Sequence, residues 1–314
     1  MKRRSLRVGS SDSGTGLEAF VSSKLDLEPG VAGRLIGQGS VYVQGKRCKN
    51  RDRVLRSEEQ VMVVLSERGR STLEPVSPQS PPVQVLFEDA ALLAVNKPAG
   101  LDSQPSASRG GDNALDLIAA RLRRRPGRVH RLDRETSGVL VFGKTSQAAG
   151  ALSDQFRRGS ALKRYLAVTS SRLPESGTID LPISKDPSRV GRYRATRSAN
   201  GEPAVTHFRR LFASDQYSLV VLYPQTGRTH QLRAHLAALG SPILGDVLYG
   251  GPVELDQQPI GRTLLHAQGL QLAHPTSAER LCLEAPLPED LAVFFKRSSV
   301  SAPTGPWEAS QIAS

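Results

Sequence analysis

The sequence predicts a protein of the α+β class, because runs rich in β-branched and aromatic residues alternate with segments of helical periodicity. Three runs have the composition of strands: VLVFG (139–143), YLAVTS (165–170) and YSLVVLYP (217–224). The segment THQLRAHLAALG (229–240) repeats leucine at Leu232, Leu236 and Leu239, begins at Thr229 as an N-cap and stops at Gly240, which is typical of a helix. The length of 314 residues accommodates two domains.

The clearest change of composition lies at residues 67–82, which are rich in Ser and Pro and predict a linker. Before it, residues 17–66 combine a helix-like apolar pattern with alternation at Val41 and Val43, a turn at Gln44-Gly45 and the run VMVV, which predicts a small helix-plus-hairpin domain. The larger domain is expected at 83–297. Residues 1–16 and 298–314 are expected to be disordered.

The net charge of +12 indicates a polyphosphate partner, and nucleic acid is the leading class. Basic residues crowd the far side of the Gln44-Gly45 turn, where they are able to follow a phosphate backbone: Lys46, Arg47, Lys49, Arg51 and Arg53. A solvated charged hairpin is the alternative that spacing alone leaves open. The basic start is followed by no apolar segment of a signal peptide, and no run approaches the roughly 20 apolar residues of a membrane span. We therefore expect a cytoplasmic protein without a membrane partner.

Several chemistries are disfavoured by spacing. GVLVFGKT (138–145) matches a nucleotide-phosphate loop, but its four variable positions favour a buried strand over a pliable loop. His230 and His235 would lie roughly 140° apart on a helix and are therefore not paired metal ligands. Cys48 and Cys282 match no metal pattern and are expected to be reduced thiols. No metal or cofactor is expected.

Asp133 is the unusual residue of the larger domain. The segment RLRRRPGRVHRLDR (121–134) contains seven arginines, and Asp133 is its only acid. Nearby positive charge favours an ionised carboxylate, which is a poor general acid and a competent nucleophile. A structural aspartate that orients an arginine is the alternative on this segment alone.

The string HRLDRETSG (130–138) resembles the signature segment of the RluA-like pseudouridine synthases, which act on large-subunit ribosomal RNA and tRNA. Four further stretches resemble the same family in the same order: NKPAG (96–100), KRYLA (163–167), QTGRTHQLRAHLAALGSPILGDVLYG (225–250) and LLHAQGLQLAHP (264–275). The likeness covers about residues 83–295. Residues 17–66 resemble an S4-type RNA-binding domain.

This resemblance implies the pseudouridine synthase fold, a mixed and largely antiparallel sheet flanked by helices around a cleft. It also implies a reaction in which the N1–C1′ bond of uridine breaks and C5 joins C1′, without cofactor or metal. Asp133 would be the nucleophile, attacking C1′ or acting on the base. Arg131 would fill the space left by the flipped base, Tyr165 would pack against the uracil, and Arg233 would pair with Asp133.

We expect a monomer whose substrate is 23S ribosomal RNA, with tRNA as the second choice. A non-catalytic ribosome-assembly factor that binds RNA is the alternative from another class. A glycoside hydrolase is disfavoured, because it needs two carboxylates across a bond. The chain has LDSQP (101–105) where many family members have a Val-His-Pro-like stretch, which predicts a difference in the loop on the substrate side.

Overall fold

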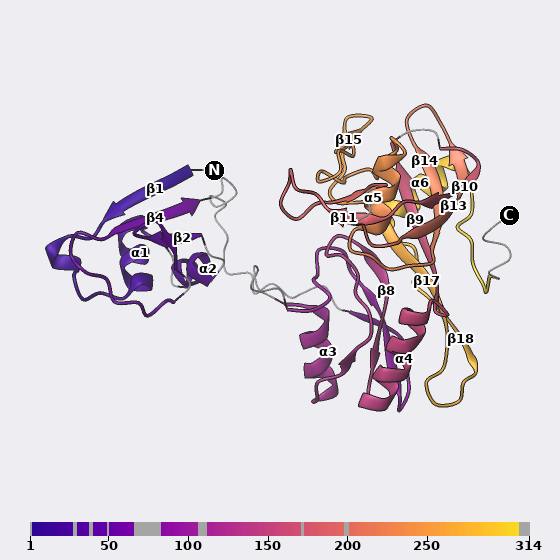
Figure 1. The fold of residues 1–314 in the computed structure, drawn as a ribbon, viewed down its shortest axis with the longest axis horizontal. Coiled ribbons are helices and arrows are strands. Elements are labelled where there is room, and N and C mark those ends of the chain that lie inside the picture. Colours follow the sequence, from indigo (N-terminus) through magenta and orange to yellow (C-terminus); the bar gives the residue numbers. More distant parts are fainter. Residues whose placement is uncertain are drawn as a thin grey trace. The chain divides into compact units, whose positions relative to one another are not determined.

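The computed structural model describes residues 2–27, 30–37, 40–48, 50–65, 83–105, 112–170, 173–197 and 201–307. The chain divides into two compact units, residues 1–79 with 105–112 and residues 80–104 with 113–314 (Figure 1). The linker predicted at 67–82 lies outside the described residues.

The first unit is a four-stranded antiparallel sheet of order β1-β4-β2-β3 with two helices. Its elements are β1 (Lys2–Arg7), the 3-10 helix η1 (Ser10–Asp12), α1 (Leu17–Leu25), α2 (Val31–Gly37), β2 (Val41–Val43), β3 (Lys46–Arg47) and β4 (Gln60–Leu65). Alternate residues of β2 and β4, such as Val41 and Val61, are fully buried with Phe20 of α1. The predicted turn is confirmed, since Gln44 and Gly45 both have positive φ and join β2 to β3.

The expectation that residues 1–16 are disordered is wrong for residues 2–16. Strand β1 pairs with β4 from Lys2↔Leu65 to Arg7↔Gln60, and Val8 is fully buried in the same core as Val61. Strand pairing uses backbone groups, so a segment with many charged side chains still forms an edge strand.

The second unit carries the remaining elements. Its strands are β5 (Gln84–Glu88), β6 (Leu92–Lys97), β7 (Gly127–Arg128), β8 (Ser137–Gly143), β9 (Leu162–Thr169), β10 (Ser176–Asp180), β11 (Ile183–Lys185), β12 (Tyr193–Ala195), β13 (Val205–Ala213), β14 (Ser218–Pro224), β15 (Glu254–Leu255), β16 (Gln258–Pro259), β17 (Leu265–Ala273) and β18 (Arg280–Glu284). Its helices are α3 (Ala114–Leu122), α4 (Ser146–Arg158), α5 (Gln231–Ala238) and α6 (Glu289–Ser298).

The main sheet of this unit has ten strands in the order β10-β13-β14-β9-β17-β8-β6-β5, with β18 beside β17 and β7 beside β8. Strands β8 and β17 pair in parallel, and the other pairings of this sheet are antiparallel. The predicted α+β class and the mixed, largely antiparallel sheet are therefore confirmed.

Strand β8 is buried on both faces, which explains its unbroken apolar run. Val139 and Val141 pack in the same cluster as Leu152 of α4, whereas Leu140 and Phe142 pack with Leu115 of α3. Figure 1 shows α3 and α4 flanking β8. Because these residues form a buried strand, GVLVFGKT is not a phosphate-binding loop, as predicted. Lys144, which follows the strand, pairs with Glu88 at 3.0 Å.

Helix α5 starts later than predicted. Its N-cap is His230 in the left-handed conformation, not Thr229, and its last helical residue is Ala238. Leu232 and Leu236 are buried in the core beside β9 and β14, as the apolar spacing predicts. Leu239 lies beyond the helix and is 42% exposed.

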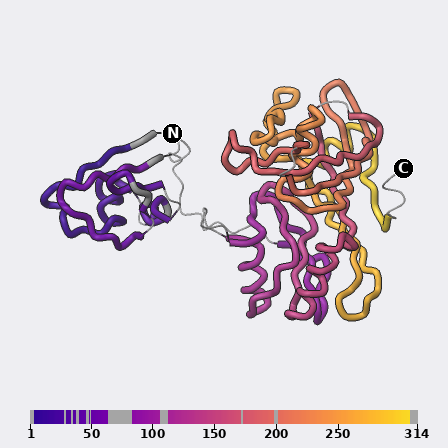
Figure 2. Tube along the Cα trace, viewed as in Figure 1, coloured from indigo at the N-terminus to yellow at the C-terminus, as the bar shows by residue number. Residues whose placement is uncertain are grey.

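The expectation that residues 298–314 are disordered is wrong for residues 298–307. Helix α6 ends at Ser298, and Trp307 is buried with the centroid of its ring 4.2 Å from the guanidinium carbon of Arg164. The segment up to residue 307 is the yellow stretch near the C-terminus in Figure 2. Arg164 is 1% exposed and also bonds Glu284, Gln268 and the carbonyl of Gly305. A buried charge with these partners holds the segment in place, and residues 308–314 lie outside the described residues.

Within the described ranges, no helix combines the length and the apolar character needed to cross a membrane.

We expect Trp307→Ala to lower the free energy of unfolding by about 3–5 kcal/mol, because it empties a large buried site and uncovers the Arg164 guanidinium. Urea denaturation followed by circular dichroism measures the change. Ser301→Ala, at an exposed position of the same segment, is the matched control. Equal midpoints for the two variants would contradict this role of Trp307.

Candidate active site

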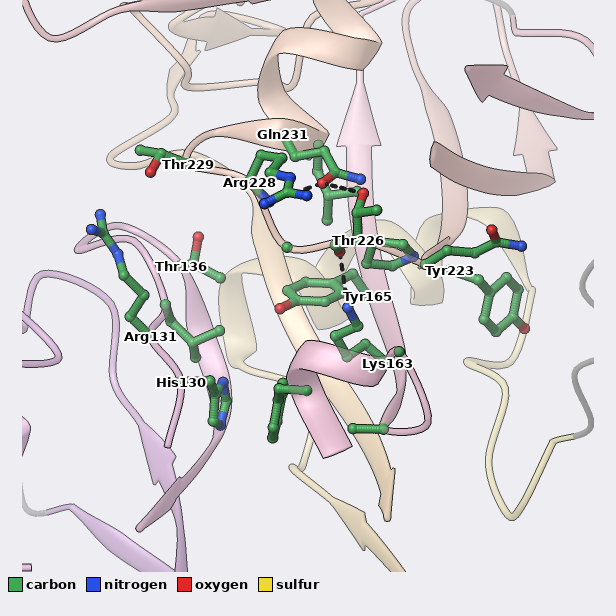
Figure 3. Close-up of a pocket in the computed structure, with 18 of the residues that line it drawn as sticks. His130, Arg131, Thr136, Lys163, Tyr165, Tyr223, Thr226, Arg228, Thr229 and Gln231 are labelled. Carbon is green, nitrogen blue, oxygen red and sulfur yellow. Dashed lines mark hydrogen bonds between the residues drawn. The ribbon is translucent and has the colours of Figure 1, made fainter. Parts of the chain in front are cut away.

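A cavity of about 850 Å³ opens in the second unit, where the loop before β8, the end of α4, strand β9 and the β14–α5 loop meet (Figure 3). This volume is in the range of ligand sites. Six cationic side chains line it: Arg131, Arg157, Arg158, Lys163, Arg228 and Arg233. Among the described lining residues, Asp133 is the one acid. Three of the cations also pair with carboxylates outside this lining: Arg157 with Asp154, Arg228 with Glu202 and Arg233 with Asp246.

Asp133 lies in a tight turn before β8. Its carbonyl accepts a hydrogen bond from the amide of Thr136 at 3.1 Å, and its side chain is 18% exposed. Gly138 follows with a φ of +117°, and a Cβ there would lie 2.1 Å from the carbonyl oxygen of Ala267 on β17. Only glycine permits this close approach, which fixes where the turn meets the sheet.

The segment that follows β6 supports this turn. Lys97 is fully buried, and its ammonium donates to the carbonyls of Pro98, Leu101 and Arg134 at 2.8–3.1 Å. Burial lowers the pKa of Lys97 to about 7, against the opposing charges of Glu135, Asp133 and Asp102. The ammonium thus ties the NKPAG segment to the backbone beside Asp133.

The LDSQP stretch also contacts the turn that contains Asp133. The hydroxyl of Ser103 donates to the carbonyl of Leu132 at 2.8 Å and accepts from the amide of Leu132 at 3.0 Å. Asp102 pairs with Arg134 at 3.4 Å. The part of the chain that departs from the family pattern therefore contacts the residues on both sides of Asp133.

Arg233 connects Asp133 to helix α5. Its Nε and Nη2 bond both oxygens of the buried Asp246 at 2.6 and 2.7 Å, and its Nη1 donates to Asp133 Oδ2 at 3.4 Å. Burial by itself lowers the pKa of Arg233, because it disfavours the charged form. The hydrogen bonds to Asp246 and the charges of Asp246 and Asp133 outweigh this effect, so the pKa of Arg233 is raised. A fixed cation thus faces the carboxylate.

The basic side chains that face Asp133 are not those of the arginines next to it in the sequence. Arg134 turns toward Asp102 and Glu135, at 3.4 and 3.6 Å. The groups that face Asp133 are Arg233 and His230, about 100 residues away, and His230 Nε2 lies 3.8 Å from Asp133 Oδ2. Neighbours in sequence project to different sides of a turn, so composition alone does not identify a side chain's partners.

Strand β9 presents Lys163 and Tyr165 to the cavity, since residues two apart share one face of a strand (Figure 3). Burial and the charge of Asp133 raise the pKa of the Tyr165 phenol, which stays protonated. The Lys163 ammonium donates to the carbonyl of Thr226 at 2.9 Å, and burial together with the charge of Arg228 lowers its pKa to about 8.

Arg131 lies at the edge of the cavity with an exposed side chain, and His130 lies beside it (Figure 3). The His130 ring stacks on Phe156 at 4.4 Å, and its Nε2 accepts from the amide of Val141. Burial lowers the pKa of His130 to about 3, so it is a neutral support for the loop.

The structure describes the side chains of only some of the predicted RNA-binding residues of the first unit. Lys49 lies outside the described residues, as do the side chains of Lys46 and Arg47. Arg51 is exposed, whereas Arg53 forms an ion pair with Glu59 at 2.9 Å.

The structure brings Asp133, Arg131, Tyr165 and Arg233 to one cavity. Sequence reasoning missed Asp246, His230 and Lys163 as parts of the site. All three lie inside the family-like stretches, and Lys163 stands two residues from Tyr165 on a predicted strand, which is a usable signal.

Comparisons with known proteins agree with this geometry. Residues 91–238 match the family model described as RNA pseudouridylate synthase. The chain is 38% identical over 275 residues to a protein named ribosomal large subunit pseudouridine synthase D of Xanthomonas campestris, covering 82% of this chain and 80% of that protein. It is 34% identical to an uncharacterised RNA pseudouridine synthase of Bacillus subtilis, covering 86% and 96%.

A solved structure is similar as well, that of human RNA pseudouridylate synthase domain containing 4. The TM-score is 0.57 at 29% identity, over 70% of this chain and 95% of that one. The fold, the cavity and the relatives lead to one conclusion: the chain belongs to the RluA-like family of RNA pseudouridine synthases and is an isomerase that acts on RNA.

Proposed function

We propose that this enzyme converts uridine to pseudouridine in large-subunit ribosomal RNA, in the cytoplasm, with Asp133 as the nucleophile. The observation that carries the chemistry is the position of Asp133 as the one acid among the described residues of a cationic cavity. The substrate class is supported by relatives named ribosomal large subunit pseudouridine synthase D, at 35–38% identity. tRNA is the second candidate.

The residues around Asp133 support the reaction. The Asp133 carboxylate attacks C1′ or acts on the base while the N1–C1′ bond breaks. C5 then bonds to C1′ and the carboxylate is released, while C5 loses its hydrogen to solvent as a proton and N1 takes up a proton. Arg233 holds the carboxylate, and the protonated Tyr165 presents a flat face and a hydroxyl to the uracil. Arg131, exposed at the cavity edge, takes the place of the flipped nucleotide in the RNA stack.

The remaining cations bind the RNA backbone. Lys163 and Arg228 line the cavity beyond Tyr165, and Arg157 and Arg158 line it at the end of α4. The first unit, with its own sheet, core and exposed Arg51, serves as an S4-like RNA-binding domain that adds phosphate contacts away from the reacting base.

Asp133→Asn is expected to reduce turnover by roughly 10³-fold or more, because the amide is no nucleophile, while RNA affinity changes little. Tritium release from [5-³H]uridine-labelled ribosomal RNA and tRNA measures turnover and identifies the responding RNA. Asp256→Asn, at an exposed site, is the matched control. An Asp133→Asn enzyme that still releases tritium at the rate of the control would exclude Asp133 as the nucleophile.

Deletion of residues 1–70 is expected to weaken RNA binding and to flatten the dependence of log affinity on log salt concentration, since phosphate contacts are lost. Filter binding between 50 and about 200 mM salt tests this. Unchanged affinity and slope would mean that the first unit does not bind RNA.

We expect kcat/KM to fall about tenfold between pH 7 and pH 9, because the Lys163 ammonium, with a pKa of about 8, loses its charge over this range. Lys163→Arg should flatten this limb, since a guanidinium stays protonated. Identical profiles for the wild type and Lys163→Arg would show that another group titrates.

A further inference from the structure

Both groups that face Asp133 approach the same carboxylate oxygen. Arg233 Nη1 lies 3.4 Å and His230 Nε2 lies 3.8 Å from Oδ2. Among the described residues, the hydrogen bond to the Asp133 side chain goes to Oδ2 and none goes to Oδ1. The two oxygens of the carboxylate therefore have different surroundings.

His230 is held at this place by an unusual backbone conformation. It is the N-cap of α5 with a φ of +56°, which non-glycine residues seldom adopt. Gln231, which is buried, fixes the turn: its Oε1 accepts from the Thr226 hydroxyl and the Arg228 amide, and its Nε2 donates to the carbonyl of Val205. Figure 3 shows Gln231 joined to Thr226 and Arg228.

The Tyr249 hydroxyl is the contact of His230 that bears on which ring nitrogen carries the proton. It accepts a hydrogen bond from the amide of Tyr193 at 3.0 Å and lies 3.1 Å from His230 Nδ1. When the hydroxyl donates to Nδ1, Nε2 of the neutral ring carries the proton. The opposite tautomer would direct a lone pair at the Asp133 carboxylate.

The surroundings keep the ring neutral. Burial lowers the pKa of His230, and the positive charges of Arg233 and Arg131 act in the same direction. The charges of Asp133 and Asp246 oppose these effects without reversing them. With its proton on Nε2, a neutral ring places an N–H group 3.8 Å from Asp133 Oδ2, beyond hydrogen-bond distance in this structure, without adding a second full charge to that of Arg233.

We propose that His230 is a positioning residue for the nucleophile: Tyr249 fixes its tautomer, its Nε2–H is directed at Asp133 Oδ2, and with Arg233 it leaves Oδ1 to react. The proposal rests on the proposed role of Asp133. It assigns a part in the reaction to a histidine and a tyrosine that lie 19 residues apart in the chain.

The test compares His230→Phe, Tyr249→Phe and the double variant by single-turnover tritium release from labelled ribosomal RNA. Each single variant should lower the maximal rate by roughly 10- to 100-fold, with KM nearly unchanged, because the proposal has the His230 N–H close on the carboxylate as a hydrogen bond when RNA is bound. The double variant should be no slower than His230→Phe, because Tyr249 acts through His230. His230→Gln, which restores an N–H donor, should recover part of the rate.

Two controls keep the outcomes separate. Tyr249→Phe removes one hydroxyl and keeps the ring packed on Arg233, and Tyr217→Phe makes the same change in the core outside the cavity and should leave the rate unchanged. Additive effects of the two substitutions, or a change confined to KM, would overturn the proposal. An inactive Asp133→Asn beside a fully active His230→Phe would overturn it while sparing the proposed function, whereas an active Asp133→Asn would refute the function itself.

Discussion

The close approach of strands β8 and β17 is the constraint on which the site depends. These strands form the parallel pairing of an otherwise antiparallel sheet, and Gly138 lies directly on the backbone of Ala267. The pairing joins the part of the sheet covered by α3 and α4 to the part covered by α5 and α6. Because Asp133 lies five residues before Gly138, this contact also determines where the carboxylate enters the cavity.

Two buried cations then complete the site from opposite directions. Lys97 uses three carbonyls to tie the segment after β6 to the turn of Asp133, and Arg233 uses the two oxygens of Asp246 to fix a guanidinium in front of it. Losing the partners of Arg233 would leave a charge buried without compensation, and losing those of Lys97 would leave a buried amine and carbonyls without hydrogen bonds; both are costly. The geometry around the carboxylate is therefore set before RNA binds.

Much of this organisation was predictable from sequence, and the exceptions have a common cause. The VLVFG strand followed from composition, and the family resemblance brought Asp133, Tyr165 and Arg233 into one site. The resemblance also predicted Arg233 as a partner of Asp133, but His230 did not follow from the sequence, because it reaches the carboxylate across about 100 residues while the adjacent Arg134 turns away. Charge and polarity predict disorder at both ends, whereas the backbone pairing of β1 orders residues 2–7 and the contacts of Trp307 hold the chain up to residue 307.

The two faces of strand β9 make different contacts, and this affects when the strand completes its folding during synthesis. Lys163 and Tyr165 face the cavity, while Arg164 between them binds the carbonyl of Gly305, 141 residues later, and the ring of Trp307. At a synthesis rate of about 5–20 residues per second, roughly 7 to 30 seconds pass between the two segments on the ribosome. The strand that carries Tyr165 therefore cannot complete its packing until residues 305–307 have been synthesised, well after its own residues.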